Sequence, residues 1–285
     1  MKPEPASLRE LYDNHPLTEA SILERVRKEG KDLNALTEED LCRDPQGGIT
    51  DQNHIGGADA VRRLAAEAEV TGSSVVLDIG CGLGGPARVL ADKSGCHVVG
   101  IDLTLSRLAA AIRLTRKISM KGRASFAAGD ARHLPLLEGR IDVIWGQSAW
   151  LHIPEKKRLL EECWRVLCPG GMIAMEDTFL GDAPGGGAAD QVDRLSRIWM
   201  AHLISLRGWT DLISRSGFEV TSTADLTPLL SRSATRMLRV LGGTDWPDEK
   251  EAWVIADRLA ANGRIVYSRV LARKREKGGQ APLSS

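Results

Sequence analysis

A glycine-rich turn between an apolar run and a helix is the first stretch of this sequence whose residues could do chemistry. The run Val75–Ile79 is short and bounded by turn-forming residues, which predicts a buried strand with Asp78 near its carboxyl end. The turn that follows contains Gly80 and Gly82, and Pro86–Ala91 begins a predicted helix with proline in a tolerated first-turn position. Such a turn lets a ligand approach backbone N–H groups and a helix N-terminus closely.

The spacing of the glycines alone leaves the ligand open. Gly80, Gly82 and Gly85 fit the G-x-G-x-x-G pattern of dinucleotide-binding proteins, and Asp102 lies about where the acid that binds the ribose should be. A tight turn in an α/β protein without a nucleotide is the alternative interpretation. The remainder of the chain has to separate these interpretations.

Acidic or amide side chains also stand at the ends of the other predicted strands. After the first, these strands are Cys96–Ile101, Ala124–Ala128, Ile141–Gly146 and Met172–Met175, with helices between them. The polar residues at the strand ends are Asp78, Asp102, Asp130, Gln147, Glu176 and Asp177. Strands that alternate with helices predict a parallel sheet covered on both faces, and ligands bind such sheets outside the carboxyl ends of the strands. We therefore expect these side chains to surround one ligand.

The chain after residue 180 is less regular. Its pattern predicts helices over Gln191–Arg207 and Trp209–Ser216 and a strand over Phe218–Thr223. The segment Leu226–Asn262 is predicted to be mostly helical, which makes it long for a connection between two strands. The alternation in Arg264–Ala272 predicts a last strand suited to the edge of a sheet.

Composition limits the class of protein. The 285 residues are 42% hydrophobic, enough to bury the core of one large domain with additions. Lys+Arg and Asp+Glu both total 38, which argues against a nucleic-acid or membrane partner bound by bulk electrostatics. The sequence shows neither an apolar run of membrane-spanning length nor a signal peptide, and its five scattered cysteines predict reduced thiols and no metal site. We expect a cytoplasmic protein that binds a small molecule; whether it forms a homo-oligomer stays open.

Four motifs together resemble the class I S-adenosylmethionine-dependent methyltransferases. They are VLDIGCGLGGPAR at 76–88, VVGIDL at 98–103, AAGDARHLPL at 127–136 and RVLCPGG at 165–171, within a resemblance that covers about residues 55–180. More narrowly, HIGG at 54–57, the GGPAR ending and Gln147 followed by Leu151-His152 resemble the small-molecule branch. That branch includes glycine, sarcosine and dimethylglycine N-methyltransferases and tocopherol-type enzymes.

The resemblance implies a fold and a division of the chain. The fold is α/β, a Rossmann-like, seven-stranded, mostly parallel sheet with helices on both faces, an antiparallel last strand and a helical substrate cap. Residues 1–57 would form an N-terminal helical and loop segment of the cap, and residues 58–180 the core that binds S-adenosylmethionine. Residues 181–273 would hold the rest of the sheet with cap insertions, and residues 274–285 a disordered tail.

The resemblance also implies eight cofactor-binding residues. Asp78 and the backbone of Gly80 and Gly82 would hold the methionine portion, and Gln147 would lie near its end, where the methyl group leaves. Asp102 would bind the ribose, and Leu103, Asp130 and Ala131 would contact the adenine. Physical chemistry agrees, because one carboxylate can accept both hydrogen bonds of a vicinal diol. A cationic sulfonium also suits acidic groups and aromatic faces better than a pyrophosphate cradle does. An NAD(P)-dependent oxidoreductase and a non-catalytic binding module remain the alternatives.

Methyl transfer from a sulfonium is an in-line displacement with a good leaving group, so the enzyme mainly positions the acceptor and excludes water. Acid–base help matters only for an acceptor that must lose a proton. His54 and His152 are the predicted catalytic residues, although each could instead be structural. His54 and Trp150 are predicted to bind the substrate, with Trp150 either lining the substrate cavity or stacking on a cationic acceptor. The resemblance favours an amine nitrogen as acceptor, with O-, C- or S-methylation of a natural-product scaffold as the alternative.

Overall fold

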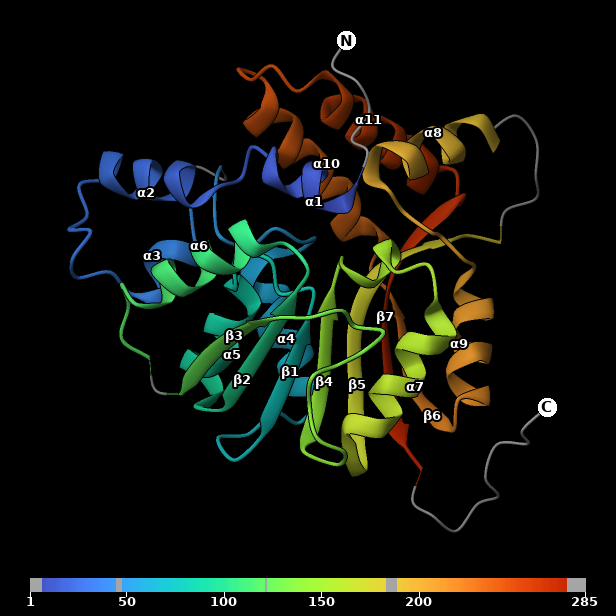
Figure 1. Cartoon of the computed structure of the whole chain (residues 1–285). Helices are drawn as coiled ribbons and strands as arrows, with labels where there is room; N and C mark the ends of the chain where they lie inside the picture. Colours follow the sequence, from blue (N-terminus) through green and yellow to red (C-terminus); the bar gives the residue numbers. More distant parts are fainter. Residues whose placement is uncertain (1–6, 45–47, 121, 183–188, 276–285) are drawn as a thin grey trace.

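One seven-stranded sheet organises the chain (Figure 1). A computed structural model describes residues 7–44, 48–120, 122–182 and 189–275. The strands are β1 (Val75–Ile79), β2 (His97–Asp102), β3 (Arg123–Ala128), β4 (Ile141–Gln147), β5 (Leu167–Leu180), β6 (Phe218–Asp225) and β7 (Ile265–Lys274). They lie in the order β3-β2-β1-β4-β5-β7-β6, and only the pairs that involve β7 are antiparallel. The predicted fold class is confirmed.

Helices cover both faces of the sheet and gather at one of its ends, at the top of Figure 1. They are α1 (Leu8–Asp13), α2 (Glu19–Lys28), α3 (Glu38–Cys42), α4 (Gly57–Glu67), α5 (Gly85–Ser94), α6 (Leu105–Thr115), α7 (Lys156–Val166), α8 (Ala189–Trp199), α9 (Leu206–Arg215), α10 (Thr227–Leu241) and α11 (Pro247–Ala261), with a 3₁₀ turn η1 (Trp150–His152). The group at the top consists of α1, α8, α10 and α11. None of the described helices is long and apolar enough to cross a membrane.

The sheet is buried on both faces, which explains why β1 is apolar without alternation. Leu77 and Ile79 pack into a cluster with residues of α7 and α9, whereas Val76 joins a second cluster with residues of α4 and α5. A third cluster joins α8, α10 and α11 through residues such as Leu195 and Leu259. Helices α8, α10 and α11 therefore share an apolar cluster, which also includes Ile265 and Tyr267 of β7.

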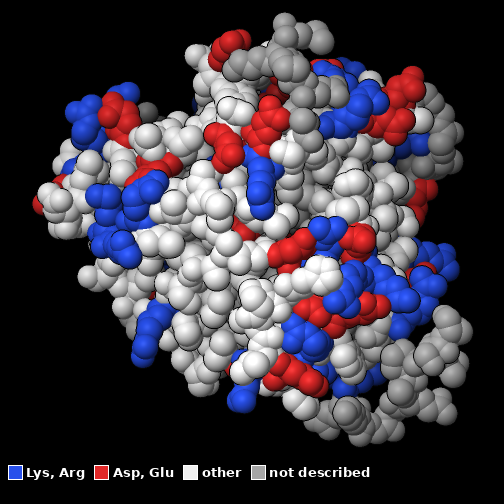
Figure 2. Space-filling model, in the orientation of Figure 1, with Lys and Arg blue, Asp and Glu red and all other residues white. Residues whose placement is uncertain are grey.

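The surface charge is mixed. On the face shown in Figure 2, Lys and Arg side chains lie beside Asp and Glu side chains over much of the area. This intermingling accords with the equal totals of 38 basic and 38 acidic residues.

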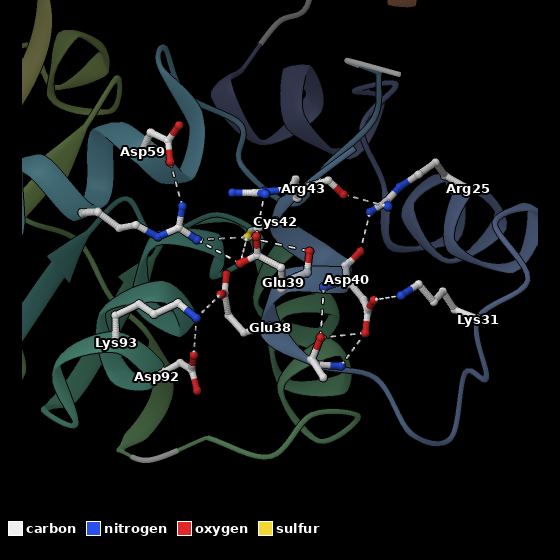
Figure 3. Close-up of polar contacts among 12 residues, drawn as sticks. Arg25, Lys31, Glu38, Glu39, Asp40, Cys42, Arg43, Asp59, Asp92 and Lys93 are labelled. Atoms are coloured by element: carbon white, nitrogen blue, oxygen red, sulfur yellow. Dashed lines mark hydrogen bonds and ion pairs between the residues drawn. The ribbon is translucent and has the colours of Figure 1, made fainter. Parts of the chain in front are cut away.

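Ion pairs fasten α3 to the helices beside it (Figure 3). Glu39 pairs with Arg43 at 2.7 Å and with Arg62 of α4 at 3.0 Å, and Glu38 lies 3.7 Å from Lys93 of α5. The ligand atoms of Glu38, Glu39 and Cys42 lie within 4.8 Å of one another, close enough to share a metal ion. Because three basic side chains already neutralise the two carboxylates, we describe this group as an ion-pair network.

A buried ion pair ties the segment before α4 to the helix after the glycine turn. The side chains of Asp51 and Arg88 are fully buried, and Arg88 Nη2 lies 2.8 Å from Asp51 Oδ2. Arg88 also donates hydrogen bonds to the carbonyl oxygens of Leu83 and Ala111. The buried guanidinium is thus surrounded by acceptors.

Most predicted elements are confirmed, but the later chain departs from prediction in three places. The strand predicted at Met172–Met175 is part of the longer β5. The helix predicted over Gln191–Arg207 is wrong beyond Trp199, where α8 ends and the next residue, Met200, has a φ of +50°. The last strand is not at an edge, because β7 lies between β5 and β6.

Two further points concern the ends of the chain. The short helix α1 was not predicted. At the other end, β7 runs to Lys274, and residues 276–285 of the predicted tail lie outside the described residues. The predicted segment boundaries stay a prediction.

The pair between Asp51 and Arg88 predicts a large stability effect. Replacing Arg88 by Met should lower the free energy of unfolding by about 3–5 kcal/mol, because the Asp51 carboxylate would stay buried without its partner. Urea unfolding measures the difference. As a control, Arg62→Met removes the partly exposed pairs with Asp59 and Glu39 and should cost about 1 kcal/mol or less. Equal losses in the two variants would contradict a structural role for the buried pair.

Candidate active site

Two neighbouring cavities open where the parallel strands end. The glycine-turn cavity is lined by the turn after β1, the end of β2 and the end of β4, including Gly80, Gly82, Asp102 and Gln147. The cap cavity is lined by residues of α1, α8, α10, α11 and the segment before α4. Four residues line both cavities: Tyr12, Asn53, His54 and Ser148. A ligand in one cavity can therefore meet a ligand in the other.

The glycine turn and the end of β2 are fixed to each other. Gly80 and Gly82 have φ values of +77° and +52°, which favour glycine, and a Cβ on Gly80 would lie 2.6 Å from Ala149 Cβ. The N–H of Gly82 donates to Asp102 Oδ2 at 2.8 Å, and the N–H of Thr104 donates to Asp102 Oδ1 at 2.8 Å. Each carboxylate oxygen keeps a further lone pair, so Asp102 can still accept from a diol in the cavity.

Asp78 carries an unsatisfied buried oxygen. The residue is 2% exposed, and its Oδ2 has no hydrogen-bond partner among the described residues. Burial, with a contribution from the Asp102 charge, raises the pKa of Asp78 to about 7. A buried acceptor without a donor costs free energy, and an ammonium group placed beside it would remove that cost. Asp78 is not among the residues that line the glycine-turn cavity, so its role at the amino group of the methionine portion stays a prediction.

Gln147 is oriented by a buried network. Its Oε1 accepts from Trp145 Nε1 at 3.1 Å, and its Nε2 donates to Glu176 Oε2 at 2.8 Å. Glu176 in turn accepts from Arg269 Nε at 2.9 Å. The amide of Gln147 is thus held in one orientation at the end of β4, with one N–H left to face the glycine-turn cavity.

The three predicted adenine contacts are not among the residues that line the glycine-turn cavity. The carboxylate of Asp130 is paired with Arg132 at 2.6 Å, and the Arg132 side chain holds the pKa of Asp130 below its usual value. Ala131 is 8% exposed and packs in the core. Roles for Leu103, Asp130 and Ala131 at the adenine stay predictions.

His54 lies where the two cavities meet. Its Nδ1 is 3.1 Å from the carbonyl oxygen of Ile55, and its Nε2 is 3.0 Å from Gln52 Oε1. Burial lowers the pKa of His54 to about 4, so the ring is neutral near pH 7. A neutral ring has only one N–H, so His54 can donate to one of these two oxygens, and its other nitrogen keeps a lone pair.

His152 forms a hydrogen bond with a tyrosine that sequence analysis did not single out. The Tyr12 hydroxyl lies 2.8 Å from His152 Nε2, and His152 Nδ1 lies 3.5 Å from the carbonyl oxygen of Met200. Burial lowers the pKa of His152 to about 4 and raises the pKa of Tyr12. From these partners we assign the proton of the neutral ring to Nδ1, so that Tyr12 donates to Nε2. The Arg107 guanidinium packs over the Tyr12 ring, 5.1 Å from its centroid.

Trp150 is not in the wall of the cap cavity, and the structure gives it a place in the core instead. It is 1% exposed and packs edge-to-face on Trp209, with the ring centroids 6.1 Å apart. Trp199 and Trp253 line the cap cavity in its place, in an edge-to-face pair with centroids 5.4 Å apart. The prediction that Trp150 stacks on the substrate has no support in this geometry.

Two charged residues line the cap cavity, and neither was predicted. They are Arg236 of α10 and Glu249 of α11. Trp253 Nε1 donates to Glu249 Oε1 at 2.9 Å, and burial raises the pKa of Glu249 to about 7. The signal that could have found these residues is the unusual length of the segment between the last two strands.

Comparison with known proteins identifies the domain. Residues 77–175 match the methyltransferase domain family. The methyltransferase GfsG of Streptomyces halstedii is 27% identical over 205 residues, which are 69% of this chain and 74% of that protein. A glycine/sarcosine/dimethylglycine N-methyltransferase of Actinopolyspora halophila is 29% identical over 181 residues, 64% of this chain. The chain matches only 32% of the length of this second relative.

A solved structure agrees on the fold. The phosphoethanolamine N-methyltransferase 2 of Haemonchus contortus, in complex with phosphomonomethylethanolamine and S-adenosylhomocysteine, superposes with a TM-score of 0.75 at 19% identity. The match covers 96% of this chain and 61% of that one. Fold, domain match and glycine turn together define an S-adenosylmethionine-dependent methyltransferase. The chain uses S-adenosylmethionine and acts on a small molecule, and the oxidoreductase interpretation is set aside.

The geometry of Asp102 predicts its contribution to cofactor binding. Asp102→Ala should weaken the binding of S-adenosylmethionine by about tenfold or more, because charge-assisted hydrogen bonds to the ribose and the tie to Gly82 are lost together. Isothermal titration calorimetry gives the dissociation constant. Asp211→Ala, at an exposed position of α9, should leave the constant unchanged. Unchanged affinity in Asp102→Ala would remove this residue from the site.

Proposed function

We propose that this chain transfers a methyl group to an amine nitrogen of a small molecule bound in the cap cavity. The observation that carries the proposal is the lining of that cavity, where Glu249 lies with Trp199 and Trp253. A carboxylate and aromatic faces both attract an ammonium group. The cap cavity meets the glycine-turn cavity at Tyr12, so an amine held there can reach the cofactor.

The glycine-turn cavity and the buried Asp78 supply the cofactor side of the proposal. Asp78 would hold the amino group of the methionine portion, and Asp102 the ribose hydroxyls, with Gly80 and Gly82 allowing close approach. Gln147 would lie near the methionine end. S-Adenosylmethionine supplies an electrophilic methyl group and leaves as a neutral thioether, so these residues have only to bind and orient.

Proton removal is the main task on the acceptor side, because an ammonium has no lone pair for the attack. Glu249 has a pKa of about 7, close to the pH at which a base is useful, so its carboxylate can take the proton. The neutral Tyr12 hydroxyl donates to His152, which leaves its oxygen lone pairs to accept a hydrogen bond from the amine N–H. In this proposal Tyr12 and His152 orient the acceptor, and His54 helps to enclose it.

A hydroxyl of a natural-product scaffold is the second candidate acceptor. The 27-O-demethylrifamycin SV methyltransferase of Amycolatopsis mediterranei is 29% identical over 176 residues, which are 61% of this chain and 64% of that protein. Part of the wall of the cap cavity is apolar, with Leu11, Leu17 and Met237. Such a wall suits a larger apolar scaffold.

An acceptor panel separates the two candidates. Purified full-length protein and S-adenosylmethionine are incubated with small primary and secondary amines, phenols and macrocyclic alcohols, and the release of S-adenosylhomocysteine is measured. We expect turnover with amines. Turnover confined to phenols or alcohols would overturn the amine proposal and favour the second candidate.

The pKa of Glu249 predicts a pH dependence. A carboxyl group whose pKa is raised to about 7 is protonated at lower pH, so the ability to bind and deprotonate an ammonium should be lost as pH falls through 7. We expect kcat/KM for an amine to rise through this range, and Glu249→Gln to lower it about tenfold or more above pH 7. In Glu249→Gln, kcat/KM should also not rise with pH around pH 7, because the titrating carboxyl group has been removed. Glu251→Gln, which alters an ion pair with Arg194, should keep the wild-type profile.

A further inference from the structure

Arg236 reaches the wall of the cap cavity without a carboxylate partner. Among the described residues it forms no ion pair, its Nε is buried without a hydrogen-bond partner, and its Nη2 has only a 3.5 Å contact with Thr50 Oγ1. Burial lowers the pKa of Arg236, while the charge of Asp44 raises it. Glu249, the other charged residue of the cavity wall, forms no ion pair with it. A guanidinium in this setting gains strongly from an anion.

The groups around Arg236 are hydrogen-bond donors. Ser233 lies one turn earlier on α10 and also lines the cavity; its Oγ accepts from the N–H of Gly56 at 3.4 Å, so its own proton is free to donate. Thr50 Oγ1 likewise accepts from the N–H of Gln52 at 3.3 Å. The hydroxyl proton of Ser233 can therefore be directed at the same ligand as the guanidinium, whereas Thr50 is 4% exposed and is not among the residues that line the cavity.

A helix N-terminus completes this surface. Helix α4 begins at Gly57, and its N-cap residue, Gly56, supplies no side-chain cap. Arg236 Nη1 would lie 3.9 Å from a Cβ on Gly57, so the guanidinium stands beside the first turn of α4. The unpaired N–H groups of a first turn favour negative charge. We call the part of the cavity wall made by Ser233 and Arg236, with Thr50 and Gly57 beside it, the Arg236 corner.

We propose that the Arg236 corner binds an anionic group, a carboxylate or a phosphate, on the same small molecule whose nitrogen is methylated. Arginine suits this role because its planar fork donates two parallel hydrogen bonds to such a group. Glu249 would then attract the positive part of the acceptor and Arg236 the negative part. The inference rests on the proposed function, and it narrows the acceptor class to amines that also carry an acid group.

The test uses inorganic phosphate and acetate as probes. Each is titrated by calorimetry into the full chain saturated with S-adenosylhomocysteine, with sodium chloride added to keep the ionic strength constant. We expect saturable binding of at least one anion to the wild type, about tenfold weaker or more in Arg236→Gln, and partly recovered in Arg236→Lys. Tighter binding of phosphate would assign a phosphate group to the acceptor, and tighter binding of acetate a carboxylate.

Controls separate this inference from the proposed function. Arg232→Gln, an exposed position of the same helix, should bind the anion as the wild type does. The affinity for S-adenosylhomocysteine should be the same in all variants, because none of these residues lines the glycine-turn cavity. If circular dichroism shows that Arg236→Gln is unfolded, Ser233→Ala replaces it, with weaker anion binding expected.

Two results of the anion titrations would overturn the inference. One is the absence of saturable binding of either anion to the wild type, and the other is equal binding to Arg236→Gln or, where it replaces that variant, Ser233→Ala. Turnover of amines with the same KM whether or not they carry an acid group would also refute it, while leaving the amine proposal standing. Failure of every amine as an acceptor, with anion binding intact, would instead refute the proposed function.

Discussion

The buried ion pair between Asp51 and Arg88 is the constraint on which both cavities depend. It fastens the segment that carries Gln52, Asn53 and His54 directly to the helix after the glycine turn. The contact is so close that a Cβ on Gly85 would lie 2.4 Å from the carbonyl oxygen of Asp51. Two glycine-rich stretches, far apart in the chain, are thereby held as neighbours. This tie helps to fix the residues that line both cavities relative to the strand ends.

The two sides of the site have different origins. The cofactor side is built from strand ends, whose positions are set by the ladder of the sheet and change little without disturbing the core. The acceptor side is built from α1, α8, α10 and α11, and the last three pack through an apolar cluster that also includes Ile265 and Tyr267 of β7. Relatives of this chain include N-, O- and C-methyltransferases by name. The separation of the two sides gives a physical reason for this variety of acceptor atoms, because the cap helices can change while the edge of the sheet that binds the cofactor is kept.

Sequence patterns predicted the sheet well because each parallel strand is a local apolar run. The patterns failed where buried residues are charged. Strand β5 continues past Met175 through Glu176 and Asp177, whose carboxylates accept hydrogen bonds from residues distant in the chain. Trp150 lies two residues before His152 in the same turn, η1, but the Trp150 side chain points into the core whereas His152 lines the cap cavity. Arg236 and Glu249 line the same cavity because α10 packs on α11, and a short-range sequence pattern does not predict which helices pack together.

The six-residue helix α1 has a consequence for ligand exchange. It contains no buried residue, and a helix of that length has little stability of its own in water. It nevertheless places Tyr12 against both cavities, where the ring is held by His152 and Arg107. Local opening of such a segment requires far less free energy than unfolding the domain. Local opening of α1 can therefore let the cofactor and the acceptor enter and leave while the sheet and its glycine turn stay folded.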